Sequence, residues 1–503
     1  MEKRQEEYDP LLRVSGVPDE YNIMYSADGR KVVGCRDCYL EEYTVREGCE
    51  TIAKNAFCNG GGLRRITLPD SIRTIGSGAF GGCTRLQDLN IPDGVTYIGA
   101  GAFGSCIQLG RVVLPKSLKM LGAGCFGYSG VREVESRSPE FECWNGLVTH
   151  VPTATLVACV STSKYCAVPE GIRRIGHKAF TGNRNVQTVM IPSTVERMAG
   201  NPFLDSGVRK CVSSSKRYSV EGDFVIEYES RRLVAWLGED KEVEIPSNIR
   251  TIGIGAFQEK NMLEKVFLRR ATASEKASWT KSVKDREVPA YPVEEKMEMP
   301  LKPFDGKVLL EENPLWTENA SEKTSPISHW TADVDASFID VEKIGDFAFA
   351  GCERLKEVFM PDTVKEIGAS AFVGCKQLEK CRIPSGVTKI KASTFHMCNM
   401  LDPGEEPLLP PGVTSIGNWA FYSCYKLKDL EIPSGVKSIG ESAFAWCTGL
   451  ETLKIPSSVT RIGWGAFMIC VKLRHALLPP SALNYRRIFR DCPKLEELEY
   501  DLD

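Results

Sequence analysis

Three glycines near the start of the chain have the spacing of a nucleotide-binding loop. Gly76, Gly78 and Gly81 match the pattern Gly-x-Gly-x-x-Gly, which cradles a pyrophosphate where a strand leads into a helix. Such a site needs a long helix after the loop, but Pro92 and Gly94 end any helix early. The same pattern also returns twice, at a step of 23 residues. The glycines therefore indicate a structural repeat rather than a nucleotide site.

Cysteines recur at one position, three residues after a phenylalanine. Nine of the 19 cysteines stand there, and the other repeats carry Gly, Ser, Asn or Lys instead. This exchange of small or hydrogen-bonding residues is typical of a buried ladder whose side chains meet backbone amides or pack tightly. Disulfides or a metal site are the alternative, although a metal needs ligands that converge. The nine are Cys83, Cys106, Cys352, Cys375, Cys398, Cys424, Cys447, Cys470 and Cys492.

Cys35 and Cys38 form a separate Cys-x-x-Cys pair. A structural zinc site would need a second pair at matching spacing, which the sequence lacks. We therefore expect that the two cysteines occur together in a loop by chance. A zinc site is the alternative. The odd total of 19 cysteines in a long chain favours a reducing compartment over a secreted disulfide framework.

Recognisable catalytic motifs are missing from the sequence. The five histidines lie in different repeats or in one insert, and the acidic residues are scattered over positions expected to be exposed. No HExxH zinc motif, Walker loop or GxSxG elbow occurs. We therefore expect a protein that is not an enzyme, with no cofactor and no metal. An unrecognised active site in an insert is the alternative.

The composition is that of a soluble, folded protein. The net charge of −3 gives no overall attraction to nucleic acid or to a membrane surface, and 42% of the residues are hydrophobic. No apolar run is long enough to cross a bilayer, and the first residues lack the apolar core of a signal peptide. We expect a cytoplasmic protein; a cell-surface or secreted protein is the alternative if a leader has been removed.

Phenylalanine anchors define about 14 repeats, most of them 23 residues long. A clean repeat runs from Ile432 to Pro456. Its residues 450–455 predict a short strand with alternate side chains pointing inward, 436–439 predict the opposite wall, and 441–446 predict a helical turn. Since one unit cannot bury its apolar face alone, stacked units predict an α/β solenoid with a parallel β-sheet. The anchors are Phe57, Phe80, Phe103, Phe126, Phe180, Phe203, Phe257, Phe349, Phe372, Phe395, Phe421, Phe444, Phe467 and Phe489.

The repeat pattern IPxxVxxIGxxAFxxCxxLxxLxIP resembles the BspA-like leucine-rich repeats, also described as the Treponema-type class. Here the Cys precedes the strand, whereas common leucine-rich repeats carry Asn or Cys after it. The resemblance implies a leucine-rich-repeat superhelix that binds partners without catalysis. It also implies a relation to bacterial and protist surface antigens and adhesins.

Four segments interrupt the repeats. Three share an apolar pair, at 32–33, 156–157 and 233–234, and predict β-hairpin insertions. The fourth, 269–340, has no anchor but is rich in polar residues and carries aromatics; it predicts a flexible insert that docks on the solenoid or on a partner, with a degenerate repeat as the alternative. The expected order is an N-terminal cap and hairpin 1–48, repeats 49–135, hairpin 136–167, repeats 168–212, hairpin 213–244, repeat 245–268, insert 269–340, repeats 341–478 and a C-terminal capping repeat 479–503.

Apolar side chains at expected surface positions are the candidate binding residues, because such residues anchor protein interfaces. One group forms a stripe on the sheet face, one lies in the turns of the C-terminal repeats, and one lies in the insert; burial by neighbouring segments is the alternative for the first two. The groups are Met190, Val212, Phe267 and Phe359; Trp419, Tyr422, Trp446 and Trp464; and Trp316 and Trp330.

Between the Val and the Ile of the repeats lies a row of basic residues with a few acids. We expect this row to be a solvated wall of the solenoid. An electrostatic face for an acidic partner is the alternative. No aromatics interleave with this row, so we expect no nucleic-acid binding. The sequence thus predicts a non-catalytic scaffold that binds a protein. A surface adhesin is the alternative, and the sequence leaves the partner and the oligomeric state open.

Overall fold

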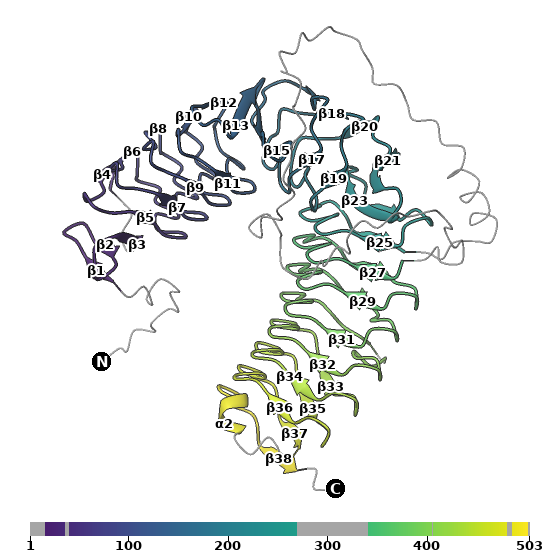
Figure 1. Cartoon of the computed structure of the whole chain (residues 1–503). Helices are drawn as coiled ribbons and strands as arrows, with labels where there is room; N and C mark the ends of the chain where they lie inside the picture. The colour runs from purple at the N-terminus through teal and green to yellow at the C-terminus, as the bar shows by residue number, and fades with distance from the viewer. Residues whose placement is uncertain (1–15, 36–39, 269–340, 405, 480–484, 501–503) are drawn as a thin grey trace.

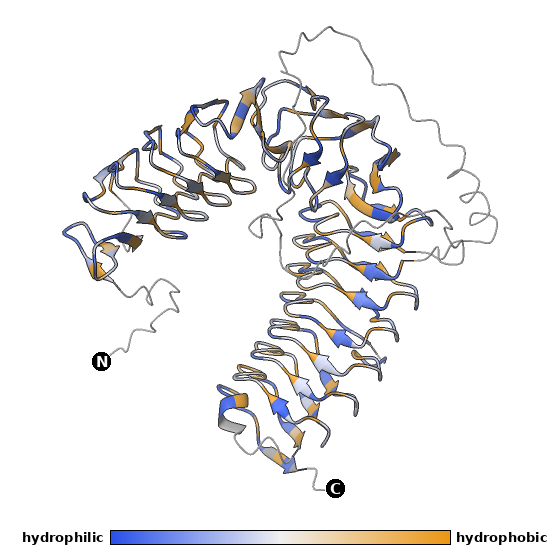
Figure 2. Cartoon of the chain, viewed as in Figure 1, coloured by the Kyte–Doolittle hydropathy of each residue, from blue (hydrophilic) through white to orange (hydrophobic). Residues whose placement is uncertain are grey.

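The fold is a solenoid of about 17 turns that forms a hook (Figure 1). The structure is a computed structural model, and it describes residues 16–35, 40–268, 341–404, 406–479 and 485–500. Each regular turn has three sides: a short strand that ends at the conserved Ile, a tip around the anchor Phe, and a strand that carries the Leu positions. Hydrophobic and hydrophilic residues alternate within the turns (Figure 2), so one side of each strand faces the core.

The first row of strands, called the Ile strands, comes from the Val-x-x-Ile segments. These strands pair in parallel with the same register from turn to turn, as Ile52 with Ile75 and Ile75 with Ile98. The row comprises β3 (Lys31–Cys35), β5 (Thr51–Ile52), β7 (Thr74–Ile75), β9 (Tyr97–Ile98), β11 (Met120–Leu121), β15 (Thr155–Cys159), β17 (Arg174–Ile175), β19 (Arg197–Met198), β23 (Arg232–Trp236), β25 (Thr251–Ile252), β27 (Lys343–Ile344), β29 (Glu366–Ile367), β31 (Lys389–Ile390), β32 (Ser415–Ile416), β34 (Ser438–Ile439) and β36 (Arg461–Ile462).

The second row, called the Leu strands, confirms the parallel sheet expected from the Leu-x-x-Leu-x-Ile segments. The row comprises β4 (Glu42–Thr44), β6 (Arg65–Thr67), β8 (Asp88–Leu89), β10 (Arg111–Leu114), β12 (Glu133–Ser136), β16 (Tyr165–Ala167), β18 (Thr188–Ile191), β20 (Lys210–Ser213), β24 (Glu242–Glu244), β26 (Lys265–Phe267), β28 (Glu357–Phe359), β30 (Lys380–Cys381), β33 (Asp429–Glu431), β35 (Thr452–Lys454), β37 (His475–Leu478) and β38 (Glu497–Tyr500).

The tips contain hydrogen-bonded turns where the sequence predicted a helical turn. At residues 441–446, alternate backbone amides bond within the tip and to the next turn: Ala445 donates to the Ser442 carbonyl, whereas Phe444 donates to that of Ala466. The α component of the expected α/β fold is therefore nearly absent, and the described residues contain one short helix, α2 (Tyr485–Ile488). A helix cannot form because every second amide is committed to the neighbouring turn.

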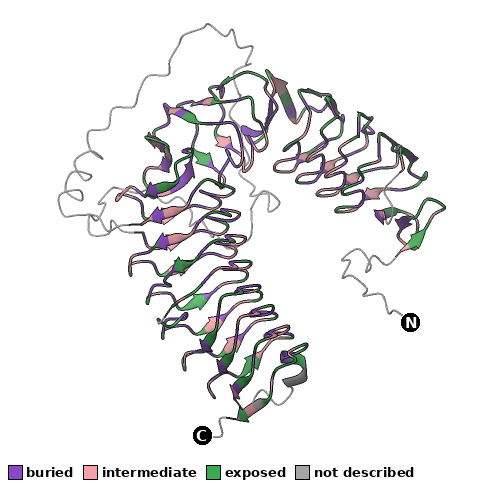
Figure 3. Cartoon of the chain, turned by 180° about the vertical axis from the view of Figure 1, so that it is seen from behind, coloured by how far each residue is buried: buried purple, intermediate pink, exposed green. Residues whose placement is uncertain are grey.

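The anchor phenylalanines stack as a column through the core. The rings of Phe421 and Phe444 lie 5.1 Å apart and nearly parallel, and those of Phe444 and Phe467 lie 5.3 Å apart. These three side chains are fully buried. Buried and exposed residues accordingly alternate within the turns of the C-terminal arm (Figure 3). Each turn with an anchor thus supplies one ring to a core that it shares with its neighbours and that no single repeat could form.

The glycines of the opening motif have separate structural roles. Gly76 has no positive φ, but a side chain there would collide with the backbone of Lys54 in the preceding turn, so its role is to let neighbouring turns approach closely. Gly78 has φ +61°, a conformation that favours glycine. Both roles are structural and belong to the stacking of the turns.

The three predicted hairpins are three-stranded meanders. In each, two antiparallel strands lead into a third strand that joins the Ile strands, as Leu156 pairs with Ile175 and Leu233 with Ile252. The apolar pairs therefore fill core positions of a full solenoid turn, which is why there are more turns than Phe anchors. The additional strands are β1 (Val17–Pro18), β2 (Ile23–Tyr25), β13 (Phe141–Trp144), β14 (Leu147–His150), β21 (Tyr218–Glu221) and β22 (Phe224–Glu227).

Residues 269–340 lie outside the described residues, yet the turns on either side of them are direct neighbours. Phe257 stacks on Phe349 at 4.9 Å, and Ile252 pairs with Ile344. This contact leaves no place between the two turns for a degenerate repeat. The register of the solenoid therefore continues directly from one flanking turn to the other.

Candidate partner-binding surface

The ladder cysteines hydrogen-bond to backbone carbonyls of the preceding turn. The thiol of Cys83 donates to Phe57 O over 3.1 Å, and that of Cys447 donates to Phe421 O over 3.3 Å; all nine make this bond. Burial raises the pKa of these two thiols to about 12, which keeps them protonated and unreactive. The structural prediction is confirmed, although the partners are carbonyls and not amides.

Other donors replace the thiol where a turn follows a meander. Asn183 donates its side-chain amide to Cys159 O over 3.1 Å, and Lys260 donates its ammonium to Gly238 O over 3.0 Å. Burial lowers the pKa of Lys260 to about 8. Since these side chains repeat the bond made by the thiols, they are structural. In the part of the chain that the structure describes, no cluster of His, Cys, Asp and Glu suits a metal ion.

Cys35 is disulfide-bonded, whereas the sequence favoured a chance pairing in a loop. It ends β3, the strand through which the first meander joins the solenoid. Cys38 lies outside the described residues.

The sheet-face stripe is divided. Met190 lies beside Val212 on β18 and β20, and Phe267 stacks on Phe359 with ring centroids 5.0 Å apart. Between the pairs runs β24, which places Glu244 next to Phe267. The expectation of four consecutive apolar positions is therefore wrong, because the third meander contributes a turn of its own.

Some basic residues of the row between Val and Ile form ion pairs with acids of the same row. Arg250 pairs with Glu342 at 2.9 Å, and Lys343 pairs with Glu366 at 3.4 Å, each across neighbouring turns. Exposed pairs of this kind contribute little to stability, but they reduce the net field of the face. The choice between a solvated wall and a face for an acidic partner stays a prediction.

The aromatic residues of the C-terminal turns lie on the tips and are exposed. Trp419, Trp446 and Trp464 keep 40%, 39% and 47% of their surface in contact with solvent. Tyr422 is half-buried and stacks on His396 with ring centroids 4.8 Å apart. We define the C-terminal tip surface as Met397, Trp419, Tyr422, Trp446, Trp464 and Met468, which come from four successive tips.

Two of these tryptophans occupy strained backbone positions. In most tips the residues two before and two after the anchor Phe have φ near +60°, a region that large side chains rarely adopt. Trp419 has φ +54° and Trp446 has φ +63°, whereas Gly78 and Gly82 occupy the two positions of an N-terminal tip. The fold requires the conformation and not the indole rings.

Sequence reasoning missed part of this surface. Met397 and Phe347 are also exposed apolar side chains at φ near +60°, and aligning the repeats on the anchor Phe would have shown both. Trp316 and Trp330 of the insert lie outside the described residues.

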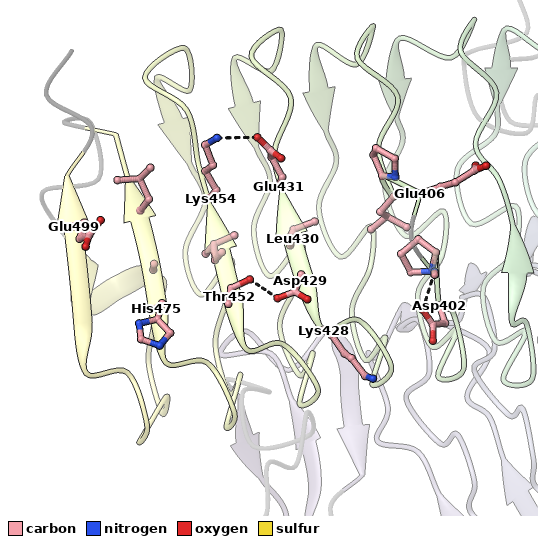
Figure 4. A pocket seen from close by; sticks show the side chains of 17 residues that line it. Asp402, Glu406, Lys428, Asp429, Leu430, Glu431, Thr452, Lys454, His475 and Glu499 are labelled. Carbon is pink, nitrogen blue, oxygen red and sulfur yellow. Dashed lines mark hydrogen bonds and ion pairs between the residues drawn. The ribbon is translucent and has the colours of Figure 1, made fainter.

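A shallow groove of about 780 Å³ lies over the Leu strands β33, β35, β37 and β38, beside the loop at 402–408 (Figure 4). Among the described residues no Leu strand lies between β30 and β33, so each of these two strands ends its sheet beside the groove. Two interactions join its lining residues: Lys454 binds Glu431 at 2.9 Å, and Thr452 hydrogen-bonds to Asp429.

The chain matches the model of the BspA type leucine rich repeat region over residues 34–140, 149–225, 335–403 and 405–501, and it belongs to this family. Such leucine-rich-repeat proteins are of a non-enzymatic type. No curated relative matches the chain. Within the described residues, no helix has the length and hydrophobicity needed to span a bilayer.

Three solved structures of bacterial leucine-rich repeat proteins are similar to the chain. A leucine-rich repeat protein from Eubacterium ventriosum is 17% identical, with 87% of each chain covered and a TM-score of 0.42. A leucine rich cell surface protein from Faecalibacterium prausnitzii is 19% identical, with 97% of this chain and 95% of that chain covered and a TM-score of 0.34. A leucine-rich repeat protein from Bacteroides ovatus is 18% identical, with 93% and 87% covered and a TM-score of 0.30.

Proposed function

We propose that this chain is a non-catalytic scaffold that binds a protein partner through its C-terminal tip surface. The observation that carries the proposal is the exposure of three tryptophans on neighbouring tips, two of them in a conformation unfavourable for large side chains. Tryptophan is the residue type most enriched among the energetic anchors of protein interfaces.

The comparison between the two ends of the solenoid supports this assignment. Around Phe80, the tip carries Ser77, Gly78, Gly81 and Gly82. Both kinds of tip stack in the same way, because the amides of Phe80 and Phe444 bond equivalent carbonyls of the next turn. The aromatic residues are thus additions that the fold does not need, on a surface that solvent reaches.

Affinity capture from the source cell tests the proposal. The bait is the full chain or a variant with Trp419→Ser, Trp446→Ser and Trp464→Ala, which installs residue types found at equivalent positions of neighbouring tips. The control is Ile107→Ser, which removes an exposed apolar side chain from an N-terminal turn. A partner captured by the wild type and the control but lost with the triple variant supports the proposal. Equal capture by all three baits contradicts it.

A second candidate is an adhesin at the cell surface, and the disulfide at Cys35 favours it. Disulfides persist in oxidising compartments and are rare in the cytosol. Fractionation of the source cell, with alkylation of free thiols before lysis, separates the two. Surface protein with Cys35 protected supports the adhesin, whereas soluble cytosolic protein with Cys35 alkylated supports the intracellular scaffold.

A further inference from the structure

We propose that the groove over β33, β35, β37 and β38 binds an extended segment of a partner protein that carries arginine or lysine at alternate positions. This site lies on the Leu strands and is separate from the C-terminal tip surface, so the inference goes beyond the proposed function. It starts from a turn that is longer than its neighbours.

A lengthened loop forms one wall of the groove. The step from Phe395 to Phe421 is 26 residues instead of 23, yet the two rings still stack at 5.3 Å and Leu409 is buried. The extra residues therefore leave the core. Pro403 and Pro407 in this loop have no amide hydrogen and cannot continue the strand ladder. The loop instead lines the groove beside β33 (Figure 4).

The floor of the groove is a sheet face whose side chains point to solvent. On β33 and β35 the outward residues are exposed and alternate with buried leucines. One row of side chains crosses the four strands in register, and Figure 4 shows this row from β33 to β38. Three of its members are exposed and the third along the row is half-buried: Glu431, Lys454, Leu477 and Glu499.

The groove concentrates negative charge. Five carboxylates and two lysines line it, which gives a formal charge of −3 with its histidine neutral. The whole chain of 503 residues carries the same net charge. The seven groups are Asp402, Glu406, Asp429, Glu431 and Glu499, with Lys428 and Lys454.

The acids of the groove are matched less well than those on an earlier part of the same sheet row. Glu264 pairs with both Lys241 and Lys356, each at 3.2 Å. In the groove, Glu406 and Glu499 make no ion pair with any residue that the structure describes. An excess of carboxylates in a groove that solvent reaches is complementary to a basic ligand.

The spacing of the acids favours an extended segment. Glu431 and Glu499 lie three strand steps apart, which is roughly 14 Å. Alternate side chains of an extended segment point the same way and repeat about every 7 Å. Two basic residues four positions apart can therefore reach both carboxylates, with an apolar residue midway near Leu477. A third basic residue, two positions earlier, faces the loop that carries Asp402 and Glu406.

Fluorescence anisotropy with a labelled peptide tests the inference. The probe has the sequence Arg-Ser-Arg-Ser-Leu-Ser-Arg. The control peptide, Arg-Arg-Arg-Ser-Ser-Leu-Ser, has the same composition and charge but the wrong spacing. Wild type should bind the probe at least about fivefold more tightly than the control peptide, and added salt should weaken the binding.

Two double variants with equal net charge show where the probe binds. Glu431→Gln with Glu499→Gln removes two groove carboxylates and keeps the side-chain shape, and it should weaken binding by about tenfold. The matched control is Glu42→Gln with Glu133→Gln, which removes two exposed carboxylates from earlier Leu strands and should bind as wild type does. The triple tryptophan variant should also bind the probe normally.

Binding that falls with the groove variant but not with the matched control supports the inference. Absence of probe binding by wild type, equal binding of the two peptides, or an equal effect of the two double variants overturns it. None of these results touches the proposed function, which the tryptophan variant tests separately. Thermal melts of each variant confirm that altered binding does not come from unfolding.

Discussion

The backbone amide of Trp446 donates to the carbonyl oxygen of Met468 in the next turn over 2.8 Å, and Trp446 there has φ +63°. Every second amide of a tip makes such a bond, so the conformation is imposed by stacking. Ser423 occupies the equivalent position one turn earlier with φ +61°. An indole at this position is costly to the backbone and remains partly in solvent, which fits selection for binding better than selection for folding.

Trp446→Gly should leave the free energy of unfolding within about 1 kcal/mol of wild type. Relief of the left-handed strain offsets the partial loss of ring contacts, since a non-glycine residue in this region costs roughly 1–2 kcal/mol. Gly82 and Gly374 already occupy the position in other tips. Urea denaturation measures the change. A loss of several kcal/mol would show that the indole is part of the core.

Cys447→Ala should destabilise the solenoid by about 1–3 kcal/mol. The substitution removes the hydrogen bond to Phe421 O and leaves a small void at a fully buried position. Cys58→Ala is the matched control, because Cys58 is exposed. Denaturant midpoints of both variants check the prediction, which fails if the two shift equally.

Stability should fall as pH rises from about 9 to 12. Burial raises the pKa of Cys447 in the folded chain to about 12, whereas an unfolded thiol ionises near 9, so the unfolded state releases its proton first. The stabilisation is complete below the unfolded pKa and is lost as pH approaches the folded pKa.

The free-energy difference between wild type and Cys447→Ser isolates this effect from other titrating groups. It should shrink by about 1 kcal/mol per pH unit across that range. A difference that does not change with pH would contradict the assigned burial of the thiol.

Deletion of residues 270–338 should leave the solenoid folded. The deletion joins Arg269 to Ile339 and restores the regular step of 23 residues between Phe257 and Phe349, whose rings already stack at 4.9 Å. Circular dichroism and thermal melting should match wild type. A collapsed melt would show that the insert supports the stack. Partner capture with the same variant tests whether Trp316 and Trp330 take part in binding.

The periodic residues predicted the solenoid because burial repeats with the chain: every anchor Phe is buried, and a Leu strand follows most of the anchors. The conformation of the tips could not be predicted in the same way. Their turns depend on backbone hydrogen bonds to the next repeat, and local helix propensity carries no information about those bonds. The meanders were underestimated for a related reason. Leu156 and Leu233 fill core positions of full turns, and this is visible only once the third strand pairs with its neighbour.

The prediction of a continuous apolar stripe on the sheet face was wrong, because the third meander places Glu244 beside Phe267. The tip tryptophans were found because an exposed aromatic at a repeated position differs from the small residues of its counterparts. Their left-handed backbone could be seen only in the structure.

Site-directed photo-crosslinking tests the central claim most directly. Tyr425 and Ile107 are both exposed, and each stands four residues after its anchor Phe, one beside the C-terminal tip surface and one in an N-terminal turn. A benzoylphenylalanine at Tyr425 should crosslink a partner protein in the source cell, and the same group at Ile107 should not. A partner that crosslinks only from Ile107, or equally from both positions, would contradict binding at the C-terminal tips.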